Sequence, residues 1–264
     1  MISSLVAWRS AAGRLAALAG AVTMFSVQPP VDWWLLAWLA PLPWLWLVAR
    51  STAAASTAPV SWRFLWLAGF LHWLATIHWL RLPHPATSIG WLLLSAYLAC
   101  YLPLFLWLAR RLVSRWGWPL VAAAPVAWMA CEQLRGWLLG GFTFGRLGHT
   151  QWRWTELLQL ADISGAVGLS GVVMLVASAV AGLLLQYLDA RDGSCVRSRR
   201  SVIWPLLQLL VFCWPQLSTV AGGWQPPRCQ LASRSMCFWC RGRSIPSSNT
   251  TPRRSLTSPG ITMN

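Results

Sequence analysis

The sequence from Glu132 to Phe144 reads EQLRGWLLGGFTF and joins an apolar run to a loop rich in glycine and aromatic residues. Glu132 and Arg135 are three positions apart, so in a helix they share a face and can pair. Ionisable side chains at membrane depth are costly and usually lie in protein or beside a polar cavity. Alternatively, the helix ends at the membrane interface and Arg135 extends to lipid headgroups.

The composition is not that of a soluble protein. Of the 264 residues, 56% are hydrophobic, 10% are charged and 22 are tryptophan. Long apolar stretches are typical of a polytopic membrane protein, and tryptophan is enriched at membrane interfaces. The net charge of +15 comes from 21 basic residues, all of them arginine, because the sequence has no lysine. Membrane topology accounts for this charge, so we do not expect nucleic-acid binding.

Seven apolar runs predict an all-α fold, a polytopic membrane helix bundle of about seven transmembrane helices in residues 1–221. The runs cover residues 15–27, 33–49, 64–80, 89–109, 119–139, 165–188 and 202–220. A cytoplasmic N-terminus would place eleven arginines inside: Arg9, Arg14, Arg50, Arg63, Arg110, Arg111, Arg115, Arg191, Arg197, Arg199 and Arg200. Four would lie outside: Arg81, Arg135, Arg146 and Arg153. This asymmetry follows the positive-inside rule and places the C-terminal tail on the outer side.

The longest predicted outer loop covers residues 140–162. Its aromatic residues alternate with glycines and with Arg146 and Arg153. Such a loop can lie at headgroup level, where arginine meets lipid phosphate. A plain interfacial loop with the tryptophans of an aromatic belt explains the same pattern.

No residue pattern indicates catalysis, a metal or a cofactor. His72 and His78 are six apart and do not share a helix face, so they are expected to be packing residues. Cys237 and Cys240 form a C-x-x-C motif without a strand–helix context, and the other cysteines lack zinc spacing. We therefore assign no catalytic residue, no metal site and no cofactor.

Four segments, in order, resemble the membrane part of bacterial apolipoprotein N-acyltransferase. Residues 39–44 (LAPLPW) resemble its LAPL segment, and residues 128–141 resemble its W…E-x-L-R-G-W-L…G-F signature. Residues 148–151 (GHTQ) resemble its G-Y-S-Q, and residues 159–170 resemble its Q-x-A-x-x-x-G-x-x-G-x-S segment. The resemblance covers roughly residues 13–220. It departs at Thr143–Phe144, where the family has Pro-Trp, and at His149, where it has Tyr.

The resemblance implies transfer of a phospholipid acyl chain to the α-amino group of the diacylglyceryl-cysteine of lipoproteins. In the family a Cys carries the acyl group as a thioester, assisted by Glu and Lys, in a nitrilase-like domain after the seventh span. The implied partners are phospholipid and diacylglyceryl lipoprotein, and the implied location is the bacterial inner (cytoplasmic) membrane with a periplasmic tail. We expect Glu132 and Arg135 to be a structural or lipid-facing pair, and Gly141, Phe142 and Gln151 to shape the outer loop.

Residues 222–264 are expected to be an irregular tail, either disordered or frameshifted. The roughly 40 residues from Gln225 onward contain no Asp, Glu or Lys and are too few for a nitrilase-like domain. A two-nucleotide frame shift over residues 239–252 permits VQGSIDTEFKYDP, which resembles the start of that domain. We expect a truncated form that is inactive alone, with a frameshift between about Val220 and Cys237.

Two alternatives stay open: a transporter-like bundle, which would show inverted repeats or broken helices at a midplane site, and a membrane-embedded lipid-binding scaffold without acyltransferase chemistry.

Overall fold

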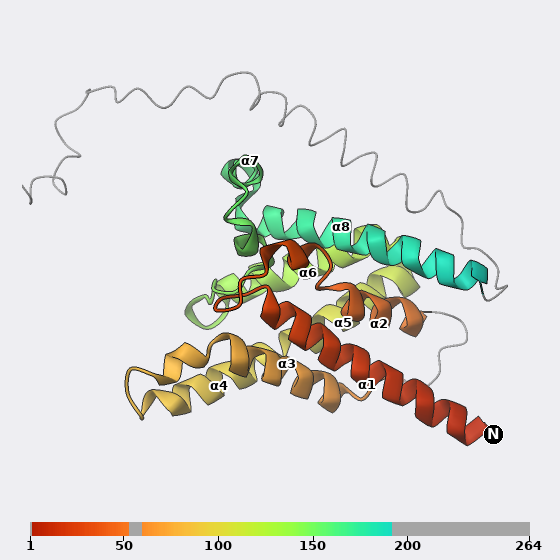
Figure 1. The fold of residues 1–264 in the computed structure, drawn as a ribbon, viewed down its shortest axis with the longest axis horizontal. Helices are drawn as coiled ribbons and strands as arrows, with labels where there is room; N and C mark the ends of the chain where they lie inside the picture. Colours follow the sequence, from red (N-terminus) through yellow and green to blue (C-terminus); the bar gives the residue numbers. More distant parts are fainter. Residues whose placement is uncertain (1, 53–59, 192–264) are drawn as a thin grey trace, which may run out of the picture. The chain divides into compact units, whose positions relative to one another are not determined.

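The computed structural model describes residues 2–52 and 60–191, which form helices joined by turns (Figure 1). No strand occurs within these residues, so the prediction of an all-α fold is confirmed for the part described. The α-helices are α1 (Ile2–Ser26), α2 (Leu42–Thr52), α3 (Trp62–Thr76), α4 (Thr87–Ala99), α5 (Tyr101–Trp116), α6 (Leu120–Trp137), α7 (Thr155–Leu158) and α8 (Ala161–Arg191). The 3₁₀ helices are η1 (Trp34–Trp38), η2 (His78–Arg81), η3 (Leu138–Gly140) and η4 (Leu147–Gln151).

Two helical segments of the described chain are long and apolar enough to cross a membrane. They are Thr87–Trp116, which combines α4 and α5, and Ala161–Leu188 in α8. The number of seven spans therefore remains a prediction. The seventh run, residues 202–220, and the tail at residues 222–264 lie outside the described residues.

The predicted run of residues 33–49 is not one continuous helix. It forms η1 and then α2, which has 11 residues. Pro41 and Pro43 explain the break, since neither can donate a backbone hydrogen bond to an earlier turn. Pro43 is tolerated because it lies in the first turn of α2, where the N–H would have no helical partner.

The predicted run of residues 89–109 is also interrupted, at Cys100 between α4 and α5. Pro103, in the first turn of α5, has no N–H for the Ala99 carbonyl four residues earlier. Helix α3 approaches this break closely. A Cβ on Gly69 would lie 2.9 Å from the Ala99 carbonyl oxygen, so a side chain there would separate the two helices.

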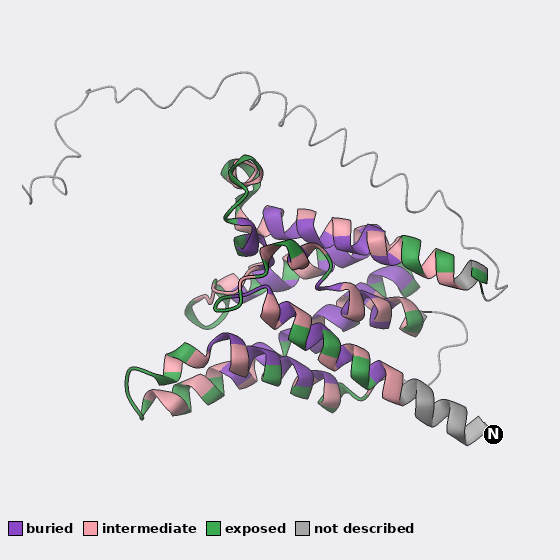
Figure 2. Ribbon diagram, in the orientation of Figure 1, coloured by how far each residue is buried: buried purple, intermediate pink, exposed green. Residues whose placement is uncertain are grey.

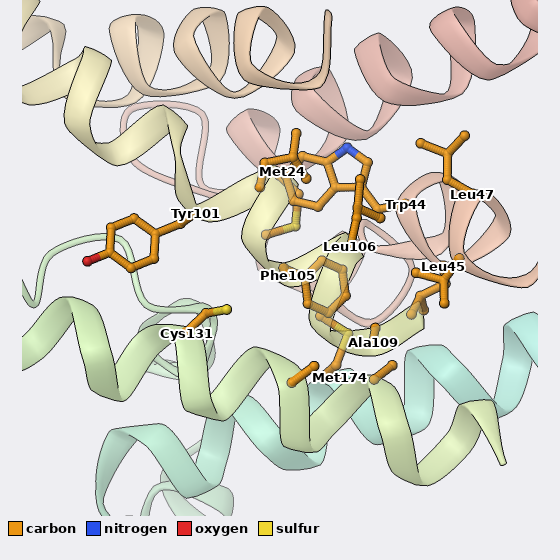
Figure 3. Packing of buried hydrophobic residues seen from close by; sticks show 14 of the residues in the cluster. Met24, Trp44, Leu45, Leu47, Tyr101, Phe105, Leu106, Ala109, Cys131 and Met174 are labelled. Atoms are coloured by element: carbon orange, nitrogen blue, oxygen red, sulfur yellow. The ribbon is translucent and has the colours of Figure 1, made fainter. Parts of the chain in front are cut away.

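The core lies where α6 packs between α5 and α8, with α2 and α3 completing it on the side of α1. Small residues make the close helix contacts: Ala123, Ala124 and Ala127 on α6 and Ala177 and Ala181 on α8 are all nearly inaccessible. Figure 2 shows the buried faces of these helices turned toward one another. Large side chains such as Phe105 and Met174 fill the spaces between them (Figure 3).

The outer faces carry large apolar side chains. Leu15 on α1 and Leu93 on α4 are each 68% exposed, and Ile89 is 66% exposed. Soluble monomers rarely show such extended apolar surfaces. Together with the two span-length helices, these faces indicate a membrane protein.

Candidate functional site

A cavity of about 40 Å³ lies among α1, α2, α3, α5 and α6. It has room for about three water molecules. Five aromatic side chains line it: Trp44, Trp73, Tyr101, Phe105 and Trp128. Figure 3 shows Trp44, Tyr101 and Phe105 together with Met24 and Cys131, which also line it. Three polar side chains interrupt this wall: His72, Glu132 and Arg135.

Glu132 is only 3% exposed and joins α6 to the loop that follows. Its Oε1 accepts a hydrogen bond from Trp128 Nε1 at 2.9 Å and another from the backbone N–H of Leu147 at 2.9 Å. The other carboxylate oxygen, Oε2, is buried without a hydrogen-bond partner. The carboxylate therefore holds residue 147 against the helix through one of its two oxygens.

Arg135 is 5% exposed and lies one turn further along α6. Its Cζ sits 4.9 Å from the centroid of the Trp73 ring, a cation–π contact. The donors Nε and Nη2 have no hydrogen-bond partner. Among the described side chains, Arg153 and Asp32 form an ion pair, but Arg135 and Glu132 do not. Glu132 and Arg135 are thus buried together without a direct salt bridge.

The chain after α6 forms a loop, residues 138–154, which we call the α6–α7 loop. Gly140 and Gly141 have φ of +86° and +81°, a region that favours glycine. A Cβ on Gly141 would collide with the carbonyl oxygen of Gly136. The Phe142 N–H donates to the Arg135 carbonyl at 3.0 Å, and its ring centroid lies 6.0 Å from that of Trp73. Gly141 therefore lets the chain fold back, and Phe142 covers Trp73.

The second half of the α6–α7 loop is bound to α8 and to the turn at η1. The Gly148 N–H donates to Ser170 Oγ at 2.7 Å. Gln151 is fully buried, and its Nε2 donates to the Trp34 carbonyl at 3.1 Å. Arg153 pairs with Asp32 at 2.8 Å at the surface. The contacts of Gln151 and Arg153 connect the loop to segments more than a hundred residues away in the sequence.

Arg146 brings a second guanidinium to the C-terminal end of α6. A Cβ on Gly136 would lie 2.8 Å from Arg146 Nη2, so this guanidinium rests on the helix backbone beside Arg135. Its Nε is buried without a hydrogen-bond partner. Partial burial, and after it the positive charges of Arg146 and Arg135, lowers the pKa of His149, although His149 keeps part of its surface exposed. The lowered pKa favours the neutral form of His149.

All five residues singled out in the sequence lie in or beside this assembly: Glu132 and Arg135 on α6, and Gly141, Phe142 and Gln151 in the loop. The sequence alone did not identify Trp73 or the Leu147 N–H as their partners. The contact between Trp128 and Glu132 could have been predicted from the sequence, since Trp128 precedes Glu132 by one helical turn. Among the described residues, no three His, Cys, Asp or Glu side chains gather as metal ligands.

Comparison with known proteins assigns these features to a family. The family model described as the apolipoprotein N-acyltransferase N-terminal domain matches residues 19–179, which include α2 to α7 and most of α8. The chain belongs to the apolipoprotein N-acyltransferase family. The matched region contains the cavity, the α6–α7 loop and Ser170, so the site lies in the part of the chain that defines membership.

Curated apolipoprotein N-acyltransferases show the same relationship. The chain is 31% identical to that of Rhodopirellula baltica over 198 residues, which is 71% of this chain and 33% of the relative. It is 35% identical to that of Chromobacterium violaceum over 189 residues, 67% of this chain and 35% of the relative. The chain thus spans about a third of the length of these relatives.

Proposed function

We propose that this chain supplies the membrane part of an apolipoprotein N-acyltransferase, the part that brings lipid and lipoprotein to the reaction. The reaction would move a phospholipid acyl chain to the α-amino group of a diacylglyceryl-cysteine at a lipoprotein N-terminus. The family match over residues 19–179 carries this proposal. The exposed apolar faces of α1 and α4 support contact with lipid.

The proposal includes the topology expected from the sequence. About seven spans would cross the bacterial inner membrane, with the N-terminus in the cytoplasm and residues 222–264 in the periplasm. The α6–α7 loop would then lie on the periplasmic side with Phe142 and Phe144. Glu132, Arg135, Gly141, Phe142 and Gln151 would give this loop its shape, and none of them would take part in acyl transfer.

The 264-residue chain contains no lysine. The family resemblance implies that acyl transfer uses a Glu, a Lys and a Cys together. We therefore propose that residues 1–264 alone do not transfer acyl groups, and that the chemistry needs a nitrilase-like domain.

A chimera tests the proposal. Residues 1–220 are joined to the part of the Chromobacterium violaceum relative that follows its matched region. N-acylation of a diacylglyceryl peptide by phospholipid is then followed by mass spectrometry for the chimera, the 264-residue chain and the relative's part alone. We expect transfer by the chimera only. Transfer by the 264-residue chain, or an inactive chimera that inserts and folds normally, would contradict the proposal.

A further inference from the structure

The end of α6 gathers more positive charge than its neighbours neutralise. Two guanidinium groups lie there: that of Arg135 on α6, and that of Arg146, whose Nη2 would lie 2.8 Å from a Cβ on the neighbouring Gly136. One carboxylate, that of Glu132, is buried on the same helix. With Glu132 ionised, these three groups hold a net charge of about +1 in a largely buried setting. A buried charge without a counter-charge is costly, and proteins usually provide it with a partner.

The donors of the cluster are also unused. Nε and Nη2 of Arg135 and Nε of Arg146 are buried and have no hydrogen-bond acceptor. The carboxylate that could accept from them is already committed at Oε1 to Trp128 and to the Leu147 N–H. Glu132 Oε2 is free but lies more than 4 Å from the nitrogens of Arg135, since no ion pair joins these two described residues.

From this geometry we infer that Arg135 and Arg146 form a binding site for one phosphate group at the end of α6, where Arg135 lines the cavity. The planar fork of arginine matches phosphate oxygens, and charge-assisted hydrogen bonds of this kind are strong. A phosphate would bring acceptors to the three unused donors and the negative charge that the cluster lacks. Its protonated oxygen or a bridging water would donate to Glu132 Oε2.

The aromatic side chains around the site favour a ligand that continues into apolar surroundings. Trp73 lies under the Arg135 guanidinium, and Phe142 packs on Trp73 from the α6–α7 loop. The phosphate could belong to a lipid headgroup or be free in solution, and both sources make the same contacts with the two arginines. The headgroup case rests on the proposed function, because it makes this site part of lipid handling.

The test uses the full chain purified in detergent, with Arg146→Gln as the main variant. Arg146 is only partly buried, so this variant should fold, which its melting temperature and circular dichroism check. Arg153→Gln is the matched control: it removes a positive charge from the same loop, where the arginine already has Asp32 as its partner. Arg135→Lys keeps the positive charge but removes the planar guanidinium group that can donate two parallel hydrogen bonds to phosphate.

Two probes separate the sources. Inorganic phosphate is titrated at constant ionic strength while thermal unfolding is followed, and phospholipid retained from vesicles of phosphatidylglycerol and phosphatidylethanolamine is counted by native mass spectrometry. Retention of one lipid that Arg146→Gln loses indicates a headgroup. Saturable stabilisation by phosphate, weakened about tenfold or more in Arg146→Gln and preserved in Arg153→Gln, indicates free phosphate.

Binding of neither probe, or equal losses in Arg146→Gln and Arg153→Gln, would overturn the site. Failure of the phosphate site can be distinguished from failure of the proposed acyltransferase function. If the chimera transfers acyl groups equally well with Arg146 and with Gln at this position, and no phosphate binds, only the phosphate site is wrong.

Discussion

The carboxylate of Glu132 accepts a hydrogen bond from the backbone N–H of Leu147, at 2.9 Å across fifteen residues of chain. The same oxygen accepts from Trp128 Nε1, so one buried atom joins the aromatic wall of the cavity to the α6–α7 loop. The loop depends on a charged residue inside a membrane helix bundle.

Glu132→Ala should lower the free energy of unfolding by about 2–4 kcal/mol, because two buried donors lose their acceptor. Glu132→Gln should cost less, since its amide oxygen can still accept both hydrogen bonds. Unfolding in detergent, followed by tryptophan fluorescence, measures the difference. Glu156→Gln, at an exposed position in α7, is the control and should change stability by less than about 0.5 kcal/mol. Equal losses in Glu132→Ala and Glu132→Gln would argue against the acceptor role.

Arg135→Ala should lower the free energy of unfolding by about 3 kcal/mol or more, because it removes the cation–π contact with Trp73 and one of the positive charges near the buried Glu132 carboxylate. Yield of inserted protein and its melting temperature are the measurements. Arg115→Ala, at the exposed end of α5, serves as control and should be close to neutral. Near wild-type stability of Arg135→Ala would show that Arg135 is not held in the core.

Gly148→Ala should be strongly destabilising, by about 2 kcal/mol or more, because overpacking against rigid atoms forces backbone shifts. The new Cβ would lie 2.5 Å from the Ala166 carbonyl oxygen and 2.9 Å from the Ser170 nitrogen, both backbone atoms of α8. Gly90→Ala on α4 is a matched control, since no atom lies within 4 Å of its added Cβ. That change should stabilise the protein by up to about 1 kcal/mol through helix propensity. Unfolding in detergent, followed by tryptophan fluorescence, measures the stability of both variants. Equal stability of Gly148→Ala and Gly90→Ala would show that the α6–α7 loop does not pack on α8.

Asp32→Asn should reduce stability by less than about 1 kcal/mol, and added salt should reduce the difference further. The reason is exposure: the Arg153 side chain in this ion pair is 49% exposed. Melting temperatures of the wild type and the variant at low and high ionic strength provide the measurement. A loss several times larger that persists in high salt would indicate a buried role for this pair.

Acidification should weaken the α6–α7 loop through His149. Folding lowers the pKa of this residue from its ordinary value of 6.5, so the unfolded chain binds the proton more readily. The stability present above pH 6.5 should therefore decline as the pH falls below it. His149→Gln should remove this part of the decline, as measured by melting temperature between pH 7.5 and pH 5. An unchanged pH profile in the variant would exclude His149 as the cause.

The sequence by itself determined the helical class, the membrane environment and the family. Apolar runs, scarce charges and four ordered motifs are local properties of the chain, so no knowledge of packing was needed to recognise them. Glu132, Arg135, Gly141, Phe142 and Gln151 were conspicuous for the same reason, since they are charged, polar or conformationally special residues beside apolar runs.

Only the tertiary structure decided what those residues contact. Sequence spacing allowed Glu132 and Arg135 to pair, but the carboxylate bonds Trp128 and Leu147 instead, and Arg135 lies over Trp73 from another helix. Helical spacing limits which residues share a face, whereas folding of the α6–α7 loop determines which donor reaches each acceptor. The boundary at Cys100 was not predicted, because apolarity continues across Pro103, which interrupts the hydrogen-bonded helix.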